Sequence, residues 1–518
     1  MPEQQVSESK ALDAFRDAEE RFHESRRNFF KLTGIGAAAI GAGSMSWPKD
    51  AFAYGGPYAP SFVLADDTLY MNIGTTGSTP REVLKNLDKN NTAIAVDPLV
   101  SFSTQNLRNT IAAGHGSDPN EIVMSFNTTD GMSKIMAGLA LAPGDEIITT
   151  NMEHPGGNGP MAISRDRDGV ILKRINLPTN DYMNDAEVLA RFQAAQTSKT
   201  KAIVFSSPPF LTGTRLNEKQ LCAWAAANGL ISIIDGAHAI GMINLNFHEM
   251  GVDFYAGAGH KWLCGPGQTG ILYIRNGTTP SAYTKTVTVY NGLSTETTAN
   301  VVINIPGYAN TNPLPKYFPT VSAAYTGAPG SVLAGGTRAS SQNVAATMMS
   351  IGNPSYPALK AVQECCSMWD AWGRQNIENY LVALAQYLRA RLVGIWGPRC
   401  LAAAYDPSTP NFARVGLTGF NPFSTGFDFN APLSVAEASA QTATSGNAVT
   451  ALRNEYKVVV RNTNCPHSLR GNPGASADAT TPGAQTSSHP LRISTHLFHR
   501  SQDVDRLVNA LLRVVPRP

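Results

Sequence analysis

The chain has 518 residues, of which 42% are hydrophobic and 15% are charged, with 45 glycines and 33 prolines. This composition predicts a large globular protein and excludes the disordered and fibrous classes. The formal net charge of +2 gives no electrostatic basis for binding nucleic acid or an anionic membrane. Six cysteines are too few for a disulfide scaffold, and their spacing matches no zinc site, so no bound metal is expected.

Residues 1–53 are typical of a secretory signal. Arg26 and Arg27 precede an aromatic pair, a weakly apolar run from Leu32 to Ser46, and the small residues of Ala51-Phe52-Ala53. A membrane anchor is disfavoured, because spanning a bilayer takes about 20 strongly apolar residues and this run is rich in glycine. The paired arginines predict recognition by the twin-arginine translocase and a periplasmic mature protein.

Short apolar runs alternate with helical patterns between residues 107 and 276, which predicts a parallel α/β sheet. Upstream, a strand near Tyr70 leads through a Gly-rich turn to a helix after Pro80. Ligands of such sheets bind at the carboxyl ends of the strands. The expected strands are Glu121–Asn127, Glu146–Thr150, Lys201–Ser206, Gly229–Asp235 and Thr269–Ile274, and the expected helices include Gly131–Ala142 and Glu218–Asn228.

The remainder predicts a second, smaller α/β domain after a long excursion. Residues 278–335 are rich in Thr, Pro, Gly and Tyr, and we expect little regular structure there. Domain boundaries are expected at 54–365 and 366–518, and residues 472–490 read either as a lid over the site or as a solvated surface loop. The expected elements of the smaller domain are long helices between Ala358 and Ile395, strands at Gly426–Phe429 and Lys457–Arg461, and a helix at Val504–Val514.

Two polar motifs follow the first expected strands. Thr128 and Thr129 open a helix, where hydroxyls and free amides can bind an anion, although an ordinary N-cap explains them equally simply. His154 follows the next strand, and an isolated histidine in such a place is more often structural than functional.

Two further motifs point to more specific chemistry. Asp235 follows an apolar strand, and a buried carboxylate there needs a cation such as a protonated pyridine nitrogen. The small residues after it, including Ala237, leave room for a flat ring. Lys261 lies among apolar and glycine residues, and burial would lower its pKa and free its amine for a Schiff base. A lone aspartate or lysine is common, so the combination carries the argument.

Together these motifs resemble the class V aminotransferases of fold type I, which use pyridoxal 5′-phosphate (PLP), and within them the isopenicillin N epimerase-like branch. The resemblance runs from about Leu69 to Leu512 and rests on Tyr70–Gly74, Asp235–His238 and His260–Pro266. It implies a large domain with a mostly parallel seven-stranded sheet flanked by helices, and a smaller C-terminal α/β domain. It also implies a homodimer with shared active sites.

The resemblance assigns roles at the cofactor. Lys261 would bind PLP covalently and move protons at the substrate Cα, while Asp235 would hold the proton on the ring nitrogen. The remaining cofactor ligands that it implies are His154 and Ala237 on the two ring faces, His238 near the phenolic oxygen, Thr128, Thr129 and His260 at the phosphate, and Thr337 reaching the phosphate of the neighbouring subunit.

The resemblance also implies a substrate side. Arg492 matches the arginine that grips the α-carboxylate, and Arg461 and Asn72 are further candidates for substrate binding. Family members often carry a phosphate-binding hydroxyl where this chain has Ala258. A ligand expected in residues 207–213 has two candidates, Ser207 and Thr212.

An aminotransferase or epimerase acting on an amino acid or an amino-acid-bearing metabolite is the favoured function, and export suits the tailoring of a secondary metabolite. A cysteine desulfurase or C–S lyase is the alternative, because Cys465 follows Arg461. That cysteine lies one position short of the usual spacing and precedes the stiffening Pro466. A PLP-binding scaffold or sensor without catalysis is a third possibility, against which the intact Lys261, Asp235 and Arg492 argue.

Overall fold

A computed structural model describes most of the chain. The described residues are 58–100, 102–178, 183–277, 282–290, 296–320, 344–402, 415–422, 434–466 and 487–516. The predicted export signal, Thr337, the expected strand Gly426–Phe429 and most of the 472–490 loop lie outside these residues. None of the described helices is long and apolar enough to cross a membrane.

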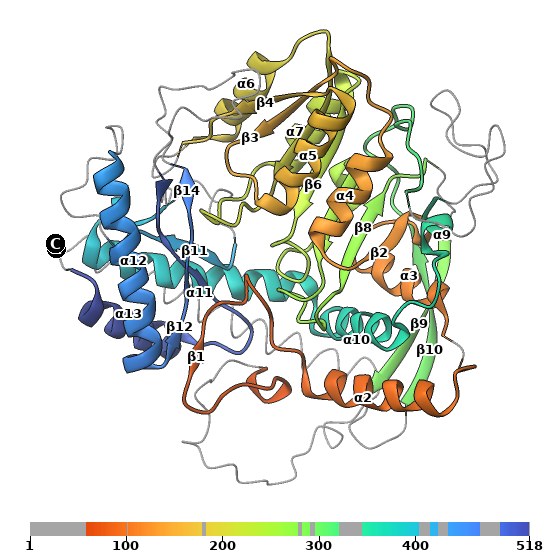
Figure 1. Cartoon of the computed structure of the whole chain (residues 1–518). Helices are drawn as coiled ribbons and strands as arrows, with labels where there is room; N and C mark the ends of the chain where they lie inside the picture. Colours follow the sequence, from red (N-terminus) through yellow and green to blue (C-terminus); the bar gives the residue numbers. More distant parts are fainter. Residues whose placement is uncertain are drawn as a thin grey trace.

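A seven-stranded sheet forms the centre of the molecule, in the order β2-β8-β7-β6-β5-β3-β4 (Figure 1). The pairs from β7 to β4 are parallel, and β8 runs antiparallel to both β7 and β2. The mostly parallel seven-stranded sheet of fold type I is therefore confirmed. Its strands are β2 (Ile122–Ser125), β3 (Glu146–Thr150), β4 (Ile171–Ile175), β5 (Thr200–Ser206), β6 (Ile231–Gly236), β7 (Phe254–Ala258) and β8 (Gly270–Ile274).

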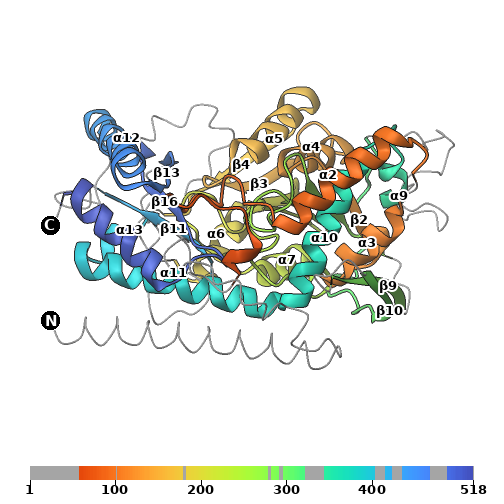
Figure 2. The same ribbon diagram turned by 90° about the horizontal axis from the view of Figure 1, so that it is seen from below.

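Helices cover both faces of this sheet, as a parallel sheet requires. Figure 2 shows α4 and α5 on one side of the sheet, and α7 with the long α11 on the other. The predicted helix after Pro80 is α2, and the predicted helix from Gly131 begins at Thr128 and ends earlier, at Gly138. The helices of this part are α2 (Arg81–Val96), α3 (Thr104–Ala113), α4 (Thr128–Gly138), α5 (Pro155–Asp168), α6 (Asp185–Ala195), α7 (Glu218–Ala227), α8 (Phe247–Met250), α9 (Val344–Met349) and α10 (Tyr356–Trp372).

A second, three-stranded antiparallel sheet has the order β11-β16-β13 and packs with α11, α12 and α13 (Figure 1). The N-terminal part of the described chain lies beside this region, because β1 pairs in parallel with β12, with Leu69 opposite Val458. The elements here are β1 (Leu69–Tyr70), α11 (Arg374–Trp396), β11 (Leu417–Phe420), α12 (Val435–Tyr456), β12 (Val458–Val459), β13 (Arg461–Asn462), β14 (Cys465–Pro466), β15 (Ser487–Ser488), β16 (Leu491–Ser494) and α13 (Ser501–Val514).

The expectation of little regular structure in residues 278–335 is wrong over its first half. β9 (Ala282–Tyr290) and β10 (Glu296–Asn304) form an antiparallel hairpin with nine register pairs. The Thr- and Val-rich sequence is typical of strands because β-branched side chains suit a pleated surface. The hairpin is tied to the body by an ion pair between Lys285 and Asp370 and by a 2.7 Å hydrogen bond from the Asn109 amide to the Thr284 carbonyl.

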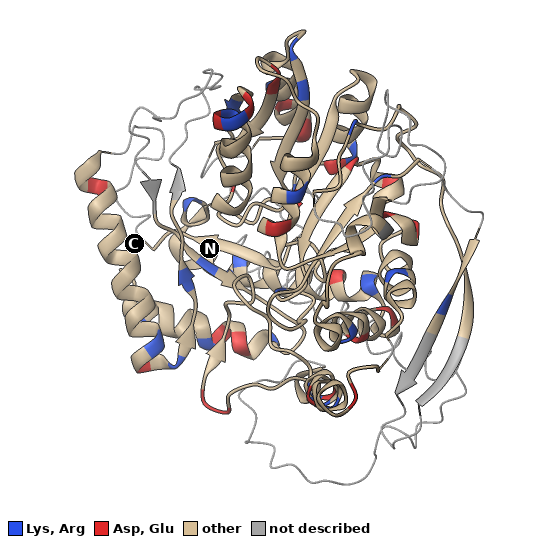
Figure 3. Ribbon diagram, turned by 45° about the vertical axis from the view of Figure 1, so that its right-hand side comes forward, with Lys and Arg blue, Asp and Glu red and all other residues tan. Residues whose placement is uncertain are grey.

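Charges of both signs are interspersed along the ribbon, in keeping with the small net charge (Figure 3). The cysteines whose side chains the structure describes are free thiols within the core, as the sparse usage predicts. They are Cys222, Cys264, Cys365, Cys366 and Cys400.

Candidate active site

The N-terminus of α4 is capped by one side chain and carries a second, buried hydroxyl that has no hydrogen-bond partner among the described residues. Asn127 is the N-cap, and its side chain accepts a 2.9 Å hydrogen bond from the Asp130 amide. Thr128 is buried, and its Oγ1 has no hydrogen-bond partner among the described residues, whereas the neighbouring Thr129 is exposed. An unpaired buried hydroxyl beside free helix amides is the arrangement expected where an anion binds.

Asp235 lies in the last part of β6 and is 3% exposed. Its Oδ1 accepts a 3.0 Å hydrogen bond from the Ala237 amide, and no described cation forms an ion pair with it. Burial raises the pKa of this carboxyl, against the opposing effects of that amide and the charge of Lys261. A β-carbon at Gly157 would lie 3.2 Å from Asp235 Oδ2, so the start of α5 approaches the carboxylate closely.

Lys261 follows β7 in a segment without regular structure. Its ammonium makes no hydrogen bond or ion pair with any described residue. Burial, first of all, and the charges of Arg492 and Arg461 lower the pKa of Lys261 to about 8, while Asp235 opposes the shift. At pH 7 about a tenth of this lysine is therefore the neutral amine that covalent catalysis needs, far more than at the usual pKa of about 10.4.

Three histidines surround the lysine in their neutral form. His154 is the N-cap of α5, where its Nδ1 accepts a 2.9 Å hydrogen bond from the Gly156 amide. Burial and then the charges of Lys261, Arg461 and Arg492 lower its pKa to about 4. Burial and the same lysine also lower the pKa values of His238 and His260. His154 has the structural role of a helix cap, as an isolated histidine often does. It also lies near the cationic groups of the site.

Arg492 lies in β16, opposite Arg461 of β13, and is 2% exposed. Its Nη2 donates to Asn72 Oδ1 at 3.1 Å and to Thr75 Oγ1 at 2.7 Å, and its Nε has no described partner. Burial and the charge of Arg461 lower its pKa to about 9. A buried guanidinium that lacks a carboxylate partner is suited to bind one from a ligand.

Close backbone contacts bring these groups together from distant parts of the chain. A β-carbon at Gly74 would lie 3.1 Å from His238 Cε1 and 3.2 Å from Arg492 Cζ. A β-carbon at Gly77 would lie 2.1 Å from the carbonyl oxygen of Lys261, and the Gly77 amide donates to the His260 carbonyl at 2.8 Å. Only glycine permits this approach, so residues 72–77 form one wall of the site.

These residues fit PLP. The unpaired Thr128 hydroxyl at a helix start suits a phosphate, the buried Asp235 suits a protonated ring nitrogen, and the partly neutral Lys261 suits an aldehyde. His154, Ala237, His238 and His260 lie around these groups, as the resemblance implies.

The two candidates in residues 207–213 are occupied within the protein. Ser207 Oγ donates to Glu218 at 2.6 Å, and Thr212 Oγ1 bonds to the Thr214 hydroxyl at 2.9 Å. Thr212 lines a small cavity together with Met152 and Leu216, which are not predicted site residues. The Ser207 hydroxyl proton is therefore used within the protein, whereas Thr212 Oγ1 accepts from Thr214 and keeps a proton to donate.

Sequence reasoning missed two groups of the site. Thr75 hydrogen-bonds Arg492 and also Asn72 Oδ1, at 2.9 Å, so it helps to orient the guanidinium. Glu153 is buried and accepts hydrogen bonds from Thr150 and Ser206, which joins the ends of β3 and β5 behind His154. The turn sequence after Tyr70 hinted at Thr75, whereas only the fold reveals the partners of Glu153.

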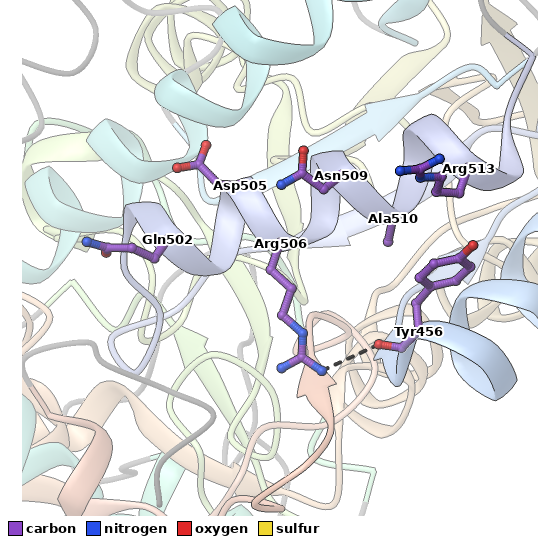
Figure 4. Close-up of a pocket in the computed structure, with 7 residues that line it drawn as sticks. All are labelled: Tyr456, Gln502, Asp505, Arg506, Asn509, Ala510 and Arg513. Carbon is purple, nitrogen blue, oxygen red and sulfur yellow. Dashed lines mark hydrogen bonds between the residues drawn. The ribbon is translucent and has the colours of Figure 1, made fainter. Parts of the chain in front are cut away.

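A separate surface hollow of about 520 Å³ lies along α13 and contains no predicted site residue (Figure 4). Arg506 reaches from α13 to the backbone there, donating to the Tyr456 carbonyl at 3.4 Å and to the Asp67 carbonyl at 2.9 Å. Its guanidinium is thus engaged in fixing the chain.

Comparisons with known proteins show which proteins this chain is similar to. Residues 72–292 match the family model "Aminotransferase class-V". The isopenicillin N epimerase of Streptomyces clavuligerus is 30% identical over 223 residues, which are 42% of this chain and 56% of that protein. A probable cysteine desulfurase of Methanothermobacter thermautotrophicus is 26% identical over 219 residues, 40% of this chain and 54% of that protein. The chain thus spans about half the length of these curated relatives.

The fold is shared with solved structures. C-DES with glycine covalently linked to its PLP cofactor superposes with a TM-score of 0.56 at 19% identity, covering 86% of this chain and 96% of that one. Residues 72–292 are thus similar to the aminotransferase class V family, and the cofactor that this similarity indicates is pyridoxal 5′-phosphate.

Proposed function

We propose that the protein is a PLP-dependent enzyme that acts at the Cα of an amino acid or an amino-acid-bearing metabolite, as an aminotransferase or an isopenicillin N epimerase-like enzyme. The observation that carries the proposal is the Lys261 amine, buried, unpaired among the described residues, and lowered in pKa to about 8, in one site with Asp235 and Arg492. A non-catalytic scaffold needs neither an arginine that binds a carboxylate nor a lysine whose pKa is lowered toward neutral pH.

Each residue of the site has its own role in the proposed reaction. Bound PLP supplies an electron-withdrawing ring that weakens the bonds at Cα. Asp235 keeps a proton on the ring nitrogen, because a buried carboxylate is stabilised by that charge. Arg492, oriented by Asn72 and Thr75, binds the α-carboxylate and fixes which Cα bond faces the lysine. Lys261 then removes the Cα proton or returns it.

The deciding experiment is incubation of the holoenzyme with a panel of amino acids and amino-acid-bearing peptides in deuterated water. Conversion of the cofactor to its amine form reports transamination. Deuterium at Cα with the cofactor spectrum restored reports epimerisation. If no amino acid gives either response, the aminotransferase and epimerase proposal is contradicted, and the scaffold is supported where no sulfide is released from cysteine either.

The cysteine desulfurase alternative is favoured by relatives that carry that name. In this chain Cys465 belongs to strand β14, paired with Ser488 of β15, and is followed by Pro466. A residue in a strand pair lacks the mobility that a sulfur-accepting cysteine needs. We expect Cys465→Ser to leave turnover of the best substrate within about twofold, with Cys400→Ser as the control. Sulfide release from cysteine that is abolished by Cys465→Ser alone would establish the alternative.

The remaining parts of the proposal concern the surroundings of the enzyme. The sequence of residues 1–53 supports export by the twin-arginine translocase to the periplasm. Common 2-oxo acid partners are cytoplasmic, so an exported enzyme of this type suits the tailoring of a secreted metabolite. The family resemblance supports a homodimer in which Thr337 reaches the neighbouring subunit's phosphate.

A further inference from the structure

Trp262 directly follows Lys261 and makes a side-chain contact with a site histidine. The indole is 0% exposed, and its Nε1–H donates to His238 Nδ1 at 3.2 Å. An indole nitrogen can only donate. His238 Nδ1 must therefore present its lone pair to the tryptophan and cannot carry a proton in this arrangement.

The other ring nitrogen then carries the proton of the neutral imidazole. Burial disfavours the imidazolium of His238, and the positive charges of Lys261 and Arg492 lower its pKa further. His238 Nε2 has no hydrogen-bond partner among the described residues. The Nε2–H group therefore has no acceptor from the described residues and can donate to a ligand.

We propose that Trp262 is a positioning residue that holds His238 in its Nε2–H tautomer, so that the imidazole offers a hydrogen-bond donor to an oxygen of the ring cofactor. The inference rests on the proposed function only for the nature of that acceptor. The tautomer itself is a property of the protein and is fixed before any cofactor binds.

The indole is rigidly placed for this task. The backbone carbonyl of Trp262 accepts a 3.0 Å hydrogen bond from His496 Nε2. A β-carbon at Gly416, just before β11, would lie 2.9 Å from Trp262 Cζ3. The close approach of Gly416 packs the backbone against the indole ring, which supports the direction of its N–H.

The matched control is Trp369, which is 1% exposed and whose Nε1–H donates to the Gly241 carbonyl at 2.7 Å. Each of the substitutions Trp262→Phe and Trp369→Phe replaces a buried indole with a smaller phenyl ring and removes one N–H donor. Both lose comparable stability, but only the first releases His238 Nδ1.

The test is nitrogen NMR of cofactor-free protein labelled with ¹⁵N-histidine, with the His238 resonances assigned by their loss in His238→Gln. Wild type and Trp369→Phe are expected to show His238 Nδ1 as an unprotonated nitrogen at neutral pH. In Trp262→Phe this resonance shifts toward that of a protonated nitrogen. A protonated Nδ1 in the wild type, or an unchanged resonance in Trp262→Phe, overturns the proposal whether or not the protein binds PLP.

A second pair of variants tests the donor role of His238 Nε2 in the holoenzyme if Trp262→Phe does not fold, and the wild-type Nδ1 resonance then still tests the tautomer. Glutamine at position 238 places an amide near the position of Nε2 and keeps the donor, whereas asparagine reaches only the position of Nδ1. His238→Asn is expected to raise the pH midpoint of the cofactor's visible absorption by up to about one unit, because a donor to an anionic oxygen is lost. His238→Gln is expected to stay near wild type, and the reverse order contradicts the proposal.

Discussion

Replacement of Lys261 by alanine is expected to abolish covalent cofactor binding and to reduce turnover by about 10²–10⁴-fold, the range contributed by a positioned acid–base group. Purified wild-type protein should show the visible absorption band of lysine-bound PLP, and the variant should lack it. Borohydride reduction followed by peptide mass spectrometry should place the cofactor on Lys261. Retention of the band in Lys261→Ala would refute the assignment of the site.

The matched variant Lys261→Arg keeps a cation of similar length but cannot form the bond, so it should also lack the band. Lys219→Ala serves as the control, because that lysine forms only an exposed ion pair with Glu249. The pKa of about 8 for Lys261 also predicts a pH dependence for cofactor capture by the cofactor-free protein. The neutral amine is the reacting form, so the rate should rise about tenfold per pH unit below that value and level off above it.

Replacement of Arg492 by glutamine is expected to lower kcat/KM by about 10²-fold or more, mainly through KM, because a buried guanidinium pairs with the substrate carboxylate. The same change should leave the free energy of unfolding of the cofactor-free protein unchanged or raised. Arg492 is 2% exposed, its pKa is lowered to about 9, and no described carboxylate compensates its charge. Urea unfolding and steady-state kinetics measure the two effects separately.

Arg389 provides the contrast for that experiment. It is also a buried arginine, but its Nη2 donates to the carbonyls of Val415 and Leu417, which support the small sheet. Arg389→Gln should therefore lower the free energy of unfolding and leave KM near wild type. If Arg492→Gln behaved in the same way as Arg389→Gln, Arg492 would be a structural residue and the proposed substrate grip would be wrong.

Much of the fold could be predicted from apolar runs, and the strands missed have physical reasons. β4 (Ile171–Ile175) carries a lysine and an arginine because it is an edge strand with one side near solvent. In β7 (Phe254–Ala258) three of the five residues are alanine or glycine, and Gly257 leaves room for Ile240, since a β-carbon there would lie 2.2 Å from Ile240 Cγ1. Tight packing selected small residues, which an apolar pattern does not reveal.

The candidate site was predictable where its residues follow strands, and unpredictable where it depends on tertiary contacts. Asp235 and His154 were found beside predicted strands, whereas Lys261 was found from its apolar and glycine-rich surroundings, because β7 before it was missed. The Trp262–His238 and Arg492–Thr75 contacts join residues that lie 24 and 417 positions apart. No local pattern encodes such partners, because the first contact joins the segments after the neighbouring strands β6 and β7, and the second joins the turn after Tyr70 to the small sheet.

The pairing of β1 with β12 has a consequence for how the protein is made. Met71 exchanges backbone hydrogen bonds with Val459 and Ser494, so the wall of the site formed by residues 72–77 is anchored to strands near the other end of the chain. Synthesis proceeds from the N-terminus, and the large sheet can form while this wall still waits for its partners. The ribosome must therefore deliver nearly the whole polypeptide before the substrate half of the active site can assemble.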